Sequence, residues 1–375
     1  MLTSRESPFR YGCIVQDRFF CPRPLLEREL TRFIRSGQNV VIQGERRMGK
    51  SSLVYETVSK MRGFRLLYVD LLNVGSVDGF CRRVLSAIKA LDARSGLLRK
   101  ALALIPRLRP VLSIDPASGE TSFSLDAAAA ADPYAVEDVV EMLASAARRN
   151  RLVIVFDEFQ DMLDVPEHKT VLSLLRGKIQ FQADVPYVFL GSVRNKMMDI
   201  FDDPDSPFYK SALTLCVGEI PREDFRTFIS LRFKDGGRTA SSEMLDRILD
   251  AANDVPGDVQ ELCEAIWEVS FGRRAVQEAD LGEALKLIYM REGEKFESWC
   301  ERLSPFQFKM LVAIARMGGQ STQSGDFLAK AGIANAATAR KSLLRLQELH
   351  YVYFFRGEYR FSSTFFREWL LSRSY

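Results

Sequence analysis

The sequence feature that most restricts the fold is the octapeptide GERRMGKS at residues 44–51, which fits the pattern GxxxxGK[ST]. It follows an apolar run, residues 39–43, and precedes a segment of helical periodicity, residues 51–61. The pattern requires this strand–loop–helix context, because its glycines let backbone N–H groups surround a phosphate and the helix N-terminus adds a positive dipole. The sequence therefore predicts a phosphate-binding loop between a strand and a helix.

The residues of this loop have distinct expected roles. Lys50 is expected to contact the β and γ phosphates of a nucleotide, and the Ser51 hydroxyl is expected to ligate Mg²⁺. The other residues expected to bind nucleotide here are Gly44, Glu45, Arg46, Arg47, Met48, Gly49 and Ser52. The expected cofactors are therefore ATP and Mg²⁺.

A second apolar run, residues 151–157, ends in Asp157 and is followed by Glu158. A phosphate-binding loop needs an acidic group nearby, and the end of a buried strand is a suitable place for it. We expect Asp157 to bind Mg²⁺, directly or through water, and Glu158 to act as the general base that polarises the attacking water. Taken alone, an apolar run followed by two acids is equally typical of a strand that ends in solvated carboxylates.

Other polar residues follow strands or lie near the loop. Ser192, after the run 185–190, is expected to contact the γ-phosphate or the water, although a turn or helix-cap role fits equally well. Asp70 ends the run 65–70, where it either pairs with Lys50, Glu158 or a metal-bound water, or is simply solvated. Candidates for a further cation at the γ-phosphate, each with a structural ion pair as its alternative, are Arg46, Arg47, Arg194, Lys210 and Arg222.

The order of elements in the first half of the chain predicts an α/β fold. Apolar runs of strand length alternate with helical segments, as expected for a parallel sheet that is buried on both faces. The runs cover residues 39–43, 65–70, 151–157 and 185–190, and the helical segments cover residues 51–61, 77–91, 136–149 and 169–181. Two alternating runs within residues 109–125 predict an inserted β-hairpin, and the alanine run 127–131 is expected to lead into a helix.

The second half is predicted to be helical, with no strand after Leu215 until the C-terminal module. Helical periodicity covers residues 221–233, 242–252, 255–270 and 280–291. Residues 304–307 (SPFQ) combine an N-cap serine, a proline and a glutamine that predict a strong helix start. That helix should end at residues 318–319, followed by helices at 325–331 and 336–350, strands at 351–355 and 359–362, and a closing helix at 364–372. This order predicts a winged helix-turn-helix.

Composition excludes several classes of chemistry. The chain has 375 residues, and its only histidines, His168 and His350, make histidine-rich metal sites and a Ser/His/Asp triad improbable. Its six cysteines form no CxxC pair and are expected to be reduced thiols. There is neither a run of about 18 apolar residues nor a signal-like N-terminus, so we expect a cytoplasmic protein with no membrane partner.

The motifs together resemble those of the archaeal-type ATPase family, P-loop proteins near the STAND and ORC-like branches of the AAA+ superfamily. The most specific matches are residues 44–53 (GERRMGKSSL) and 157–160 (DEFQ). Supporting matches are residues 20–23 (FCPR) with Glu27 or Glu29, residues 68–71 (YVDL), Gly191 and Ser192 with Met197, residues 206–210 (SPFYK), and Pro256 with Gln260 and Trp267.

The resemblance implies a three-layer α/β nucleotide domain (residues 1–215, with the hairpin inserted near 109–125), a helical lid (216–295) and a winged helix-turn-helix domain (296–375). It further implies ATP binding and slow hydrolysis that switches the domain arrangement. Arg23 and Pro256 are nucleotide-binding candidates through the resemblance. Two departures affect them: residues 21–22 (CP) replace a glycine before Arg23, and residues 256–260 contain no arginine that could act as a second sensor.

The sequence leaves the partner open between double-stranded DNA and protein. The net charge is +3, but residues 301–375 hold eleven Lys and Arg against five Asp and Glu, which favours nucleic acid. The residues expected to contact DNA are Thr338, Arg340, Lys341 and Arg345 on the recognition helix, and Arg356 and Arg360 on the wing. Leu343, Leu344 and Leu346 are expected to be core residues.

The alternative is a STAND-like signalling ATPase whose winged helix docks on a protein partner or on the chain itself. Its candidate surface consists of Phe354, Phe355, Phe361, Phe365, Phe366 and Trp369, although most of these are expected to fill the core of the module. A third interpretation is a protein that binds nucleotide without turnover.

Overall fold

The computed structural model describes residues 6–91, 110–114, 121–125, 132–192, 194–355 and 357–373. The chain divides into two compact units. One unit is Ile14–Gly218, which contains the parallel sheet, and the other combines the N-terminal segment up to Cys13 with Glu219–Tyr375.

The first unit is built on a five-stranded parallel sheet with the order β2-β5-β6-β1-β7. Its strands are β1 (Val40–Gln43), β2 (Arg65–Asp70), β5 (Leu152–Asp157), β6 (Tyr187–Gly191) and β7 (Leu213–Cys216). All residues of β1, β5 and β6 are buried, as expected for central strands that are covered on both faces. The prediction of an α/β fold with a buried parallel sheet is confirmed.

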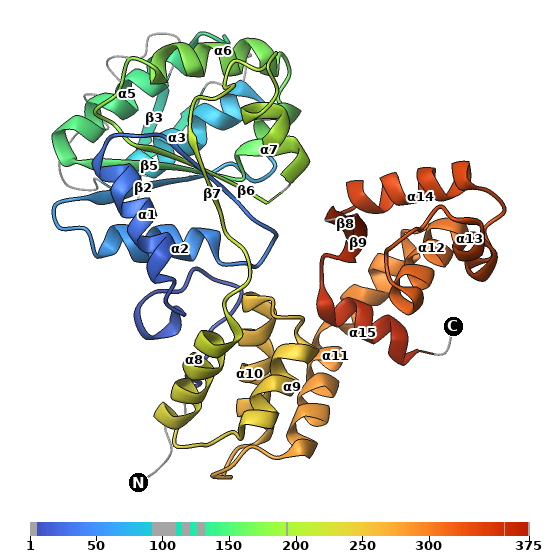
Figure 1. Cartoon of the computed structure of the whole chain (residues 1–375). Coiled ribbons are helices and arrows are strands. Elements are labelled where there is room, and N and C mark those ends of the chain that lie inside the picture. Colours follow the sequence, from blue (N-terminus) through green and yellow to red (C-terminus); the bar gives the residue numbers. More distant parts are fainter. Residues whose placement is uncertain are drawn as a thin grey trace. The chain divides into compact units, whose positions relative to one another are not determined.

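Helices cover both faces of this sheet (Figure 1). On one side α1 (Pro24–Arg35) packs with α2 (Lys50–Ser59), and on the other α3 (Val77–Leu91), α5 (Ala135–Asn150) and α6 (His168–Ile179) pack side by side. Further elements of the unit are η1 (Asp17–Phe19), η3 (Phe159–Asp164) and α7 (Arg194–Phe201). The arrangement has three layers, and the carboxyl ends of the strands lie at the edge where α2 begins.

An aromatic cluster fills the core between the sheet and the second helical layer. Phe156, Phe159 and Phe189 lie with their ring centroids 4.7–6.0 Å apart, and each is fully buried. Burying one such side chain contributes roughly 1.5–3 kcal/mol. The cluster therefore fixes η3 against β5 and β6 directly after Asp157 and Glu158.

One strand of the sheet was missed by the sequence analysis. β7 pairs in parallel with β1, with Val40 opposite Leu213 and Gln43 opposite Cys216. It lies at the sheet edge and buries only Leu215 among its four residues, so it lacks the continuous apolar run of the central strands. For that reason the sequence analysis placed no strand at these residues, although its expectation that strands end near Leu215 agrees with the end of β7 at Cys216. The helix α1 was also not predicted.

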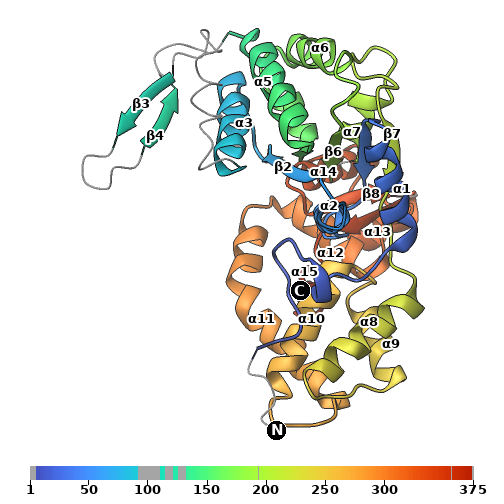
Figure 2. The same ribbon diagram turned by 90° about the vertical axis from the view of Figure 1, so that its left-hand side faces the viewer.

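The inserted hairpin is confirmed. β3 (Pro110–Ile114) pairs antiparallel with β4 (Thr121–Leu125), with Leu112 opposite Phe123. Figure 2 shows the two strands as a separate sheet beside α3. The alanine run 127–131 lies outside the described residues.

The second unit begins with four helices, α8 (Arg222–Asp235), α9 (Ser242–Ala251), α10 (Pro256–Val269) and α11 (Glu278–Glu301). The longest, α11, has 24 residues and runs without a break through residues 295 and 296. Its first part packs on α10 and its last turns pack on α15, where Phe296 contacts Phe366 and Trp369. The same helix therefore serves the helical part of the unit and the C-terminal module.

The C-terminal module is a winged helix. Its elements are α12 (Pro305–Met317), α13 (Gly325–Ala331), α14 (Ala336–Glu348), β8 (Val352–Phe355), β9 (Glu358–Phe361) and α15 (Thr364–Ser372). The predicted helix start is confirmed, because Ser304 and Gln307 form a capping box. The wing also pairs with the chain after α12 through a bridge between Gln320 and Glu358. A Cβ on Gly319 would lie 1.8 Å from the Tyr359 carbonyl oxygen, so only glycine fits at this position.

Candidate functional site

The phosphate-binding loop joins β1 to α2, and its two glycines are required for different physical reasons. Gly49 is the N-cap of α2 and has φ 83°, a left-handed conformation that disfavours side chains. A Cβ on Gly44 would lie 2.4 Å from the carbonyl oxygen of Val217, just after β7. The edge strand missed in the sequence therefore explains why residue 44 must be glycine.

The side chain of Lys50 lies inside the loop that it follows. Its Nζ donates hydrogen bonds to the carbonyl oxygens of Gly44 (2.8 Å) and Glu45 (2.9 Å), and the residue is 7% exposed. Burial lowers the pKa of Lys50, while the nearby carboxylates of Glu158 and Asp157 act to raise it. The loop thus holds a cation whose hydrogen bonds go to neutral carbonyl oxygens, which a phosphate can replace as partner.

Asp157 lies at the carboxyl end of β5 and connects three elements. Its Oδ2 accepts a hydrogen bond from the Ser51 hydroxyl at 2.6 Å and another from the Tyr68 hydroxyl, and its Oδ1 accepts the Glu158 backbone N–H at 2.8 Å. The structure therefore brings Ser51 and Asp157, the two expected Mg²⁺ ligands, into direct contact. Tyr68 is a residue that sequence analysis did not assign. Its place two residues before Asp70, and so on the same face of β2, was the available signal.

Glu158 follows Asp157 in a left-handed conformation with φ 50°. Its Oε2 accepts hydrogen bonds from the Ser192 hydroxyl at 2.7 Å and from Gln160 Nε2 at 2.6 Å. Ser192, expected to contact phosphate or water, thus lies at the end of β6 and contacts the expected general base. Gln160 had no role assigned beyond its place in the DEFQ motif.

Asp70 does not pair with Lys50 or Glu158. Its side chain is exposed, and its Oδ1 accepts the backbone N–H of Leu72 at 2.9 Å. The alternative of a solvated acid at a strand end applies, because Asp70 lies beside Asp157 in the sheet register but on the less buried outer strand β2.

Arg23 is buried behind the loop. Its guanidinium donates to the carbonyl oxygens of Met48 and Gly218, each at 2.8 Å, and burial lowers its pKa to about 10. Arg23 thereby fixes the loop to the segment after β7. Among the other loop residues, Ser52 accepts the backbone N–H of Val15 at 3.1 Å, and Arg46 is exposed.

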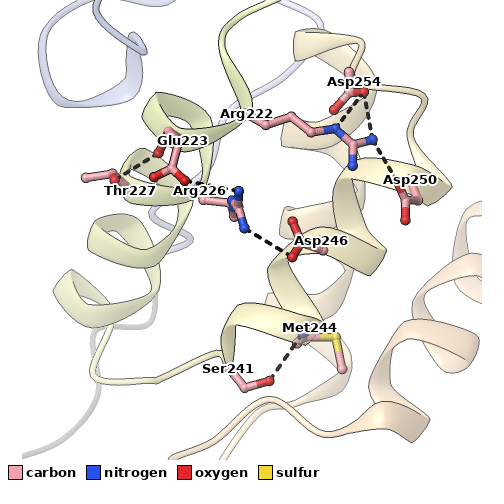
Figure 3. A network of polar contacts seen from close by, with 9 residues as sticks. All are labelled: Arg222, Glu223, Arg226, Thr227, Ser241, Met244, Asp246, Asp250 and Asp254. Atoms are coloured by element: carbon pink, nitrogen blue, oxygen red, sulfur yellow. Dashed lines mark hydrogen bonds and ion pairs between the residues drawn. The ribbon is translucent and has the colours of Figure 1, made fainter.

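The candidates for a further cation have different local environments. Lys210 is exposed, and its Nζ lies 5.0 Å from the centroid of the Tyr209 ring. The side chain of Arg194 lies outside the described set. Arg222 belongs to the second unit, where it bonds to Asp254 (2.8 and 3.1 Å) and Asp250 (2.6 Å) (Figure 3). These hydrogen bonds raise the pKa of Arg222 and connect α8 to the end of α9. The alternative of a structural ion pair therefore applies to Arg222.

Pro256 is the first residue of α10, where proline is favoured because the first turn needs no N–H donor. It belongs to the second unit.

On the winged helix, α14 presents an exposed basic face. Arg340, Lys341 and Arg345 are exposed and Thr338 is half-buried, while Arg345 forms an ion pair with Glu348 at 2.9 Å. Leu343 and Leu346 are buried, but Leu344 is 52% exposed, so its assignment to the core was wrong. Leu344 lies on the same face of α14 as Arg340 and Lys341, away from the face that contacts α12.

The wing residues have different environments. Arg360 bonds to Glu358 at 2.5 Å and lies over the Phe355 ring, and Arg356 is outside the described residues. Of the aromatic candidates for docking, Phe365, Phe366 and Trp369 are buried in the module, whereas Phe354 is 48% exposed.

Comparisons with known proteins agree with this architecture. Residues 294–372 match the family model of a probable winged helix domain. A Walker-type ATPase of Pyrococcus abyssi superimposes with a TM-score of 0.67 at 16% identity, covering 99% of this chain and 100% of that one. The Aeropyrum pernix ORC1 protein, solved in complex with DNA, gives a TM-score of 0.53 at 13% identity over 95% and 94% of the chains. None of the curated proteins matches the sequence.

These findings define the class of fold. The chain has the α/β fold of the AAA+ type of P-loop protein, followed by a helical region and a winged-helix domain. The resemblance stated from the motifs is thus confirmed for the fold. None of the described helices combines the length and apolar character of a membrane span.

The hydroxyl of Tyr68 provides a test of the hydrogen bonds around Asp157. Tyr68→Phe removes one donor to a buried carboxylate, so we expect the free energy of unfolding to fall by about 1–3 kcal/mol. Tyr55→Phe is the matched control, because the ring centroid of Tyr55 lies 5.3 Å from that of Tyr68. The free energy of unfolding of this variant should stay within about 0.5 kcal/mol of that of wild type. Urea unfolding measures both, and an unchanged Tyr68→Phe protein would contradict the described geometry.

Proposed function

We propose that the chain binds Mg·ATP at the loop of residues 44–51 and hydrolyses it slowly, using the nucleotide state as a conformational switch. The observation that supports this most is the 2.6 Å contact between Ser51 Oγ and Asp157 Oδ2, beside the buried ammonium group of Lys50. The three groups come from the loop, its helix and the end of β5, which is the arrangement that triphosphate chemistry requires.

The residues present fit a magnesium ion. Across the described ranges, no cluster of three or more His, Cys, Asp and Glu side chains could hold a metal by itself. Ser51 and Asp157 offer hard oxygen donors, and Mg²⁺ commonly takes one or two protein ligands and completes its shell with phosphate and water. When bound, Mg²⁺ would neutralise charge on the β and γ phosphates.

The protein side of the reaction is divided among the loop and the two acids. Backbone N–H groups of the loop and Lys50 bind the phosphates, with Gly44, Glu45, Arg46, Arg47, Met48, Gly49 and Ser52 forming the loop and its first turn. Arg23 holds the loop in place through Met48. Glu158 accepts the proton of the attacking water, with Ser192 and Gln160 orienting its carboxylate through Oε2.

Replacing the acid and the lysine separates binding from turnover. Glu158→Gln keeps the shape and the hydrogen-bonding capacity but cannot accept the proton, so phosphate release should fall by about 10²–10⁴-fold while ATP binding persists. Lys50→Ala should lose both ATP binding and phosphate release. Glu167→Gln, an exposed acid before α6, is the control and should retain wild-type turnover.

Phosphate release and ATP binding are measured on the same preparations. If wild-type protein releases no more phosphate than Glu158→Gln while still binding ATP, the assignment of hydrolysis is wrong and binding without turnover remains. If no variant binds ATP, the nucleotide site itself is contradicted.

We further propose that the winged helix couples this switch to double-stranded DNA through α14. Arg340 and Lys341 are exposed on one face, and the 75 C-terminal residues carry an excess of six positive charges. Thr338 and Arg345 complete the α14 face, and Arg356 and Arg360 are the candidates on the wing. The similarity to a protein solved in complex with DNA supports the same partner. In this proposal the α/β domain ends near residue 215 and the helical lid near residue 295.

The second candidate is a STAND-like signalling ATPase with a protein-docking winged helix. The exposed Leu344 and Phe354 favour it, because isolated apolar side chains near cations also suit protein interfaces. Salt dependence separates the two candidates.

Binding to a DNA duplex should weaken steeply with salt if α14 contacts phosphates. The double variant Arg340→Ala with Lys341→Ala should reduce the slope of log K against log salt by about two, because two phosphate contacts are lost. Lys309→Ala with Lys330→Ala removes equal charge from α12 and α13 and should leave the slope within about half a unit of wild type. Fluorescence anisotropy measures both, and a wild-type protein without salt-dependent duplex binding would favour the docking alternative.

A further inference from the structure

A cavity of about 560 Å³ lies at the edge of the sheet opposite to the phosphate-binding loop. Leu152 opens β5, and Phe64 and Pro186 immediately precede β2 and β6, so the cavity meets the amino ends of the strands. The nucleotide site lies at their carboxyl ends. The two sites are therefore separated by the length of the strands.

The cavity is strongly basic. Four arginines line it, together with a single carboxylate, that of Asp184; the arginines are Arg35, Arg62, Arg148 and Arg151. Arg148 donates from Nε to Asp184 Oδ2 at 2.9 Å, which lowers the pKa of Asp184. The side chains of the other three arginines form no ion pair or hydrogen bond with the part of the chain that the structure describes. Among the described residues, three positive charges of the lining are therefore not neutralised by an acidic side chain.

Helix dipoles explain part of this arrangement. Arg35 ends α1 and Arg148 lies in the last turn of α5, where cations offset the negative helix dipole. Arg62 and Arg151 lie beyond their helices, in the connections to β2 and β5. A Cβ on Gly63 would lie 3.5 Å from Arg151 Nη1, so Arg151 reaches the turn that carries Arg62. The helix dipoles account for the positions of Arg35 and Arg148 but not for the meeting of four arginines around one cavity.

The size and lining of the cavity indicate a small phosphorylated ligand. Cavities of roughly 300–1,000 Å³ hold small molecules, and guanidinium groups bind phosphate in a bidentate manner. Phe64, Ala147, Leu152 and Pro186 add an apolar wall. We propose that this cavity binds a small molecule with two or more phosphate groups, separately from the ATP site. This proposal does not rest on ATP hydrolysis.

The test uses the full chain with Lys50→Ala, so that the phosphate-binding loop does not contribute, and inorganic pyrophosphate as the probe. Calorimetry should show one pyrophosphate per chain. Arg62→Ala with Arg151→Ala should weaken this binding by at least about tenfold, because each removes a charge-assisted contact. Arg28→Ala with Arg32→Ala, two exposed arginines of α1 outside the cavity, should change it by less than about twofold.

Three results would overturn the proposal. In the first, pyrophosphate does not bind the Lys50→Ala chain. In the second, both double arginine variants weaken pyrophosphate binding equally, as expected for unspecific attraction. In the third, duplex DNA binds through Arg62 and Arg151 while pyrophosphate does not, which would make the cavity a nucleic-acid contact. If thermal unfolding shows that the double variant is not folded, Arg35→Ala replaces it, and the same weakening of pyrophosphate binding is expected.

Discussion

The nucleotide site depends on the hydrogen bonds that the carboxylate of Asp157 accepts. Asp157 ends a strand of six buried residues and receives the hydroxyls of Ser51 and Tyr68 together with the N–H of Glu158. These bonds connect the helix after the loop, the neighbouring strand and the general base to one carboxyl group. Because β5 is buried on both faces, Asp157 cannot move without disturbing the sheet. The position of the chemistry is therefore set by the core.

This dependence explains how far the sequence could predict the structure. The loop, the acid pair and the buried strands have strong local signals, since glycine spacing and continuous apolar runs arise directly from their physical roles. β7 could not be found in this way, because an edge strand with one buried residue has no apolar run. The contacts of Tyr68, Gln160 and Arg23 also escaped prediction. They depend on the register of β2 and β5, on the turn after Glu158 and on a carbonyl 195 residues away in the sequence. The exposure of Leu344 depends on where α14 meets α12.

The two proposed ligand sites use the two ends of one sheet in different ways. At the carboxyl ends, loop N–H groups and a buried lysine surround a phosphate position next to carboxylates, which suits a metal and its nucleotide. At the amino ends, arginines in the connections lie around a cavity with one acid, which suits phosphate without a metal. In the second unit, α11 continues without a break from the helical region into the winged helix and packs on both α10 and α15.

The most direct test of the central claim is a calorimetric titration of the wild-type chain with ATP, carried out once with Mg²⁺ and once with EDTA. If Ser51 and Asp157 hold the metal beside Lys50, one ATP should bind at this loop, and removing Mg²⁺ should weaken its affinity by at least about tenfold. Equal ATP affinity with and without Mg²⁺, or no binding in either buffer, would contradict the account.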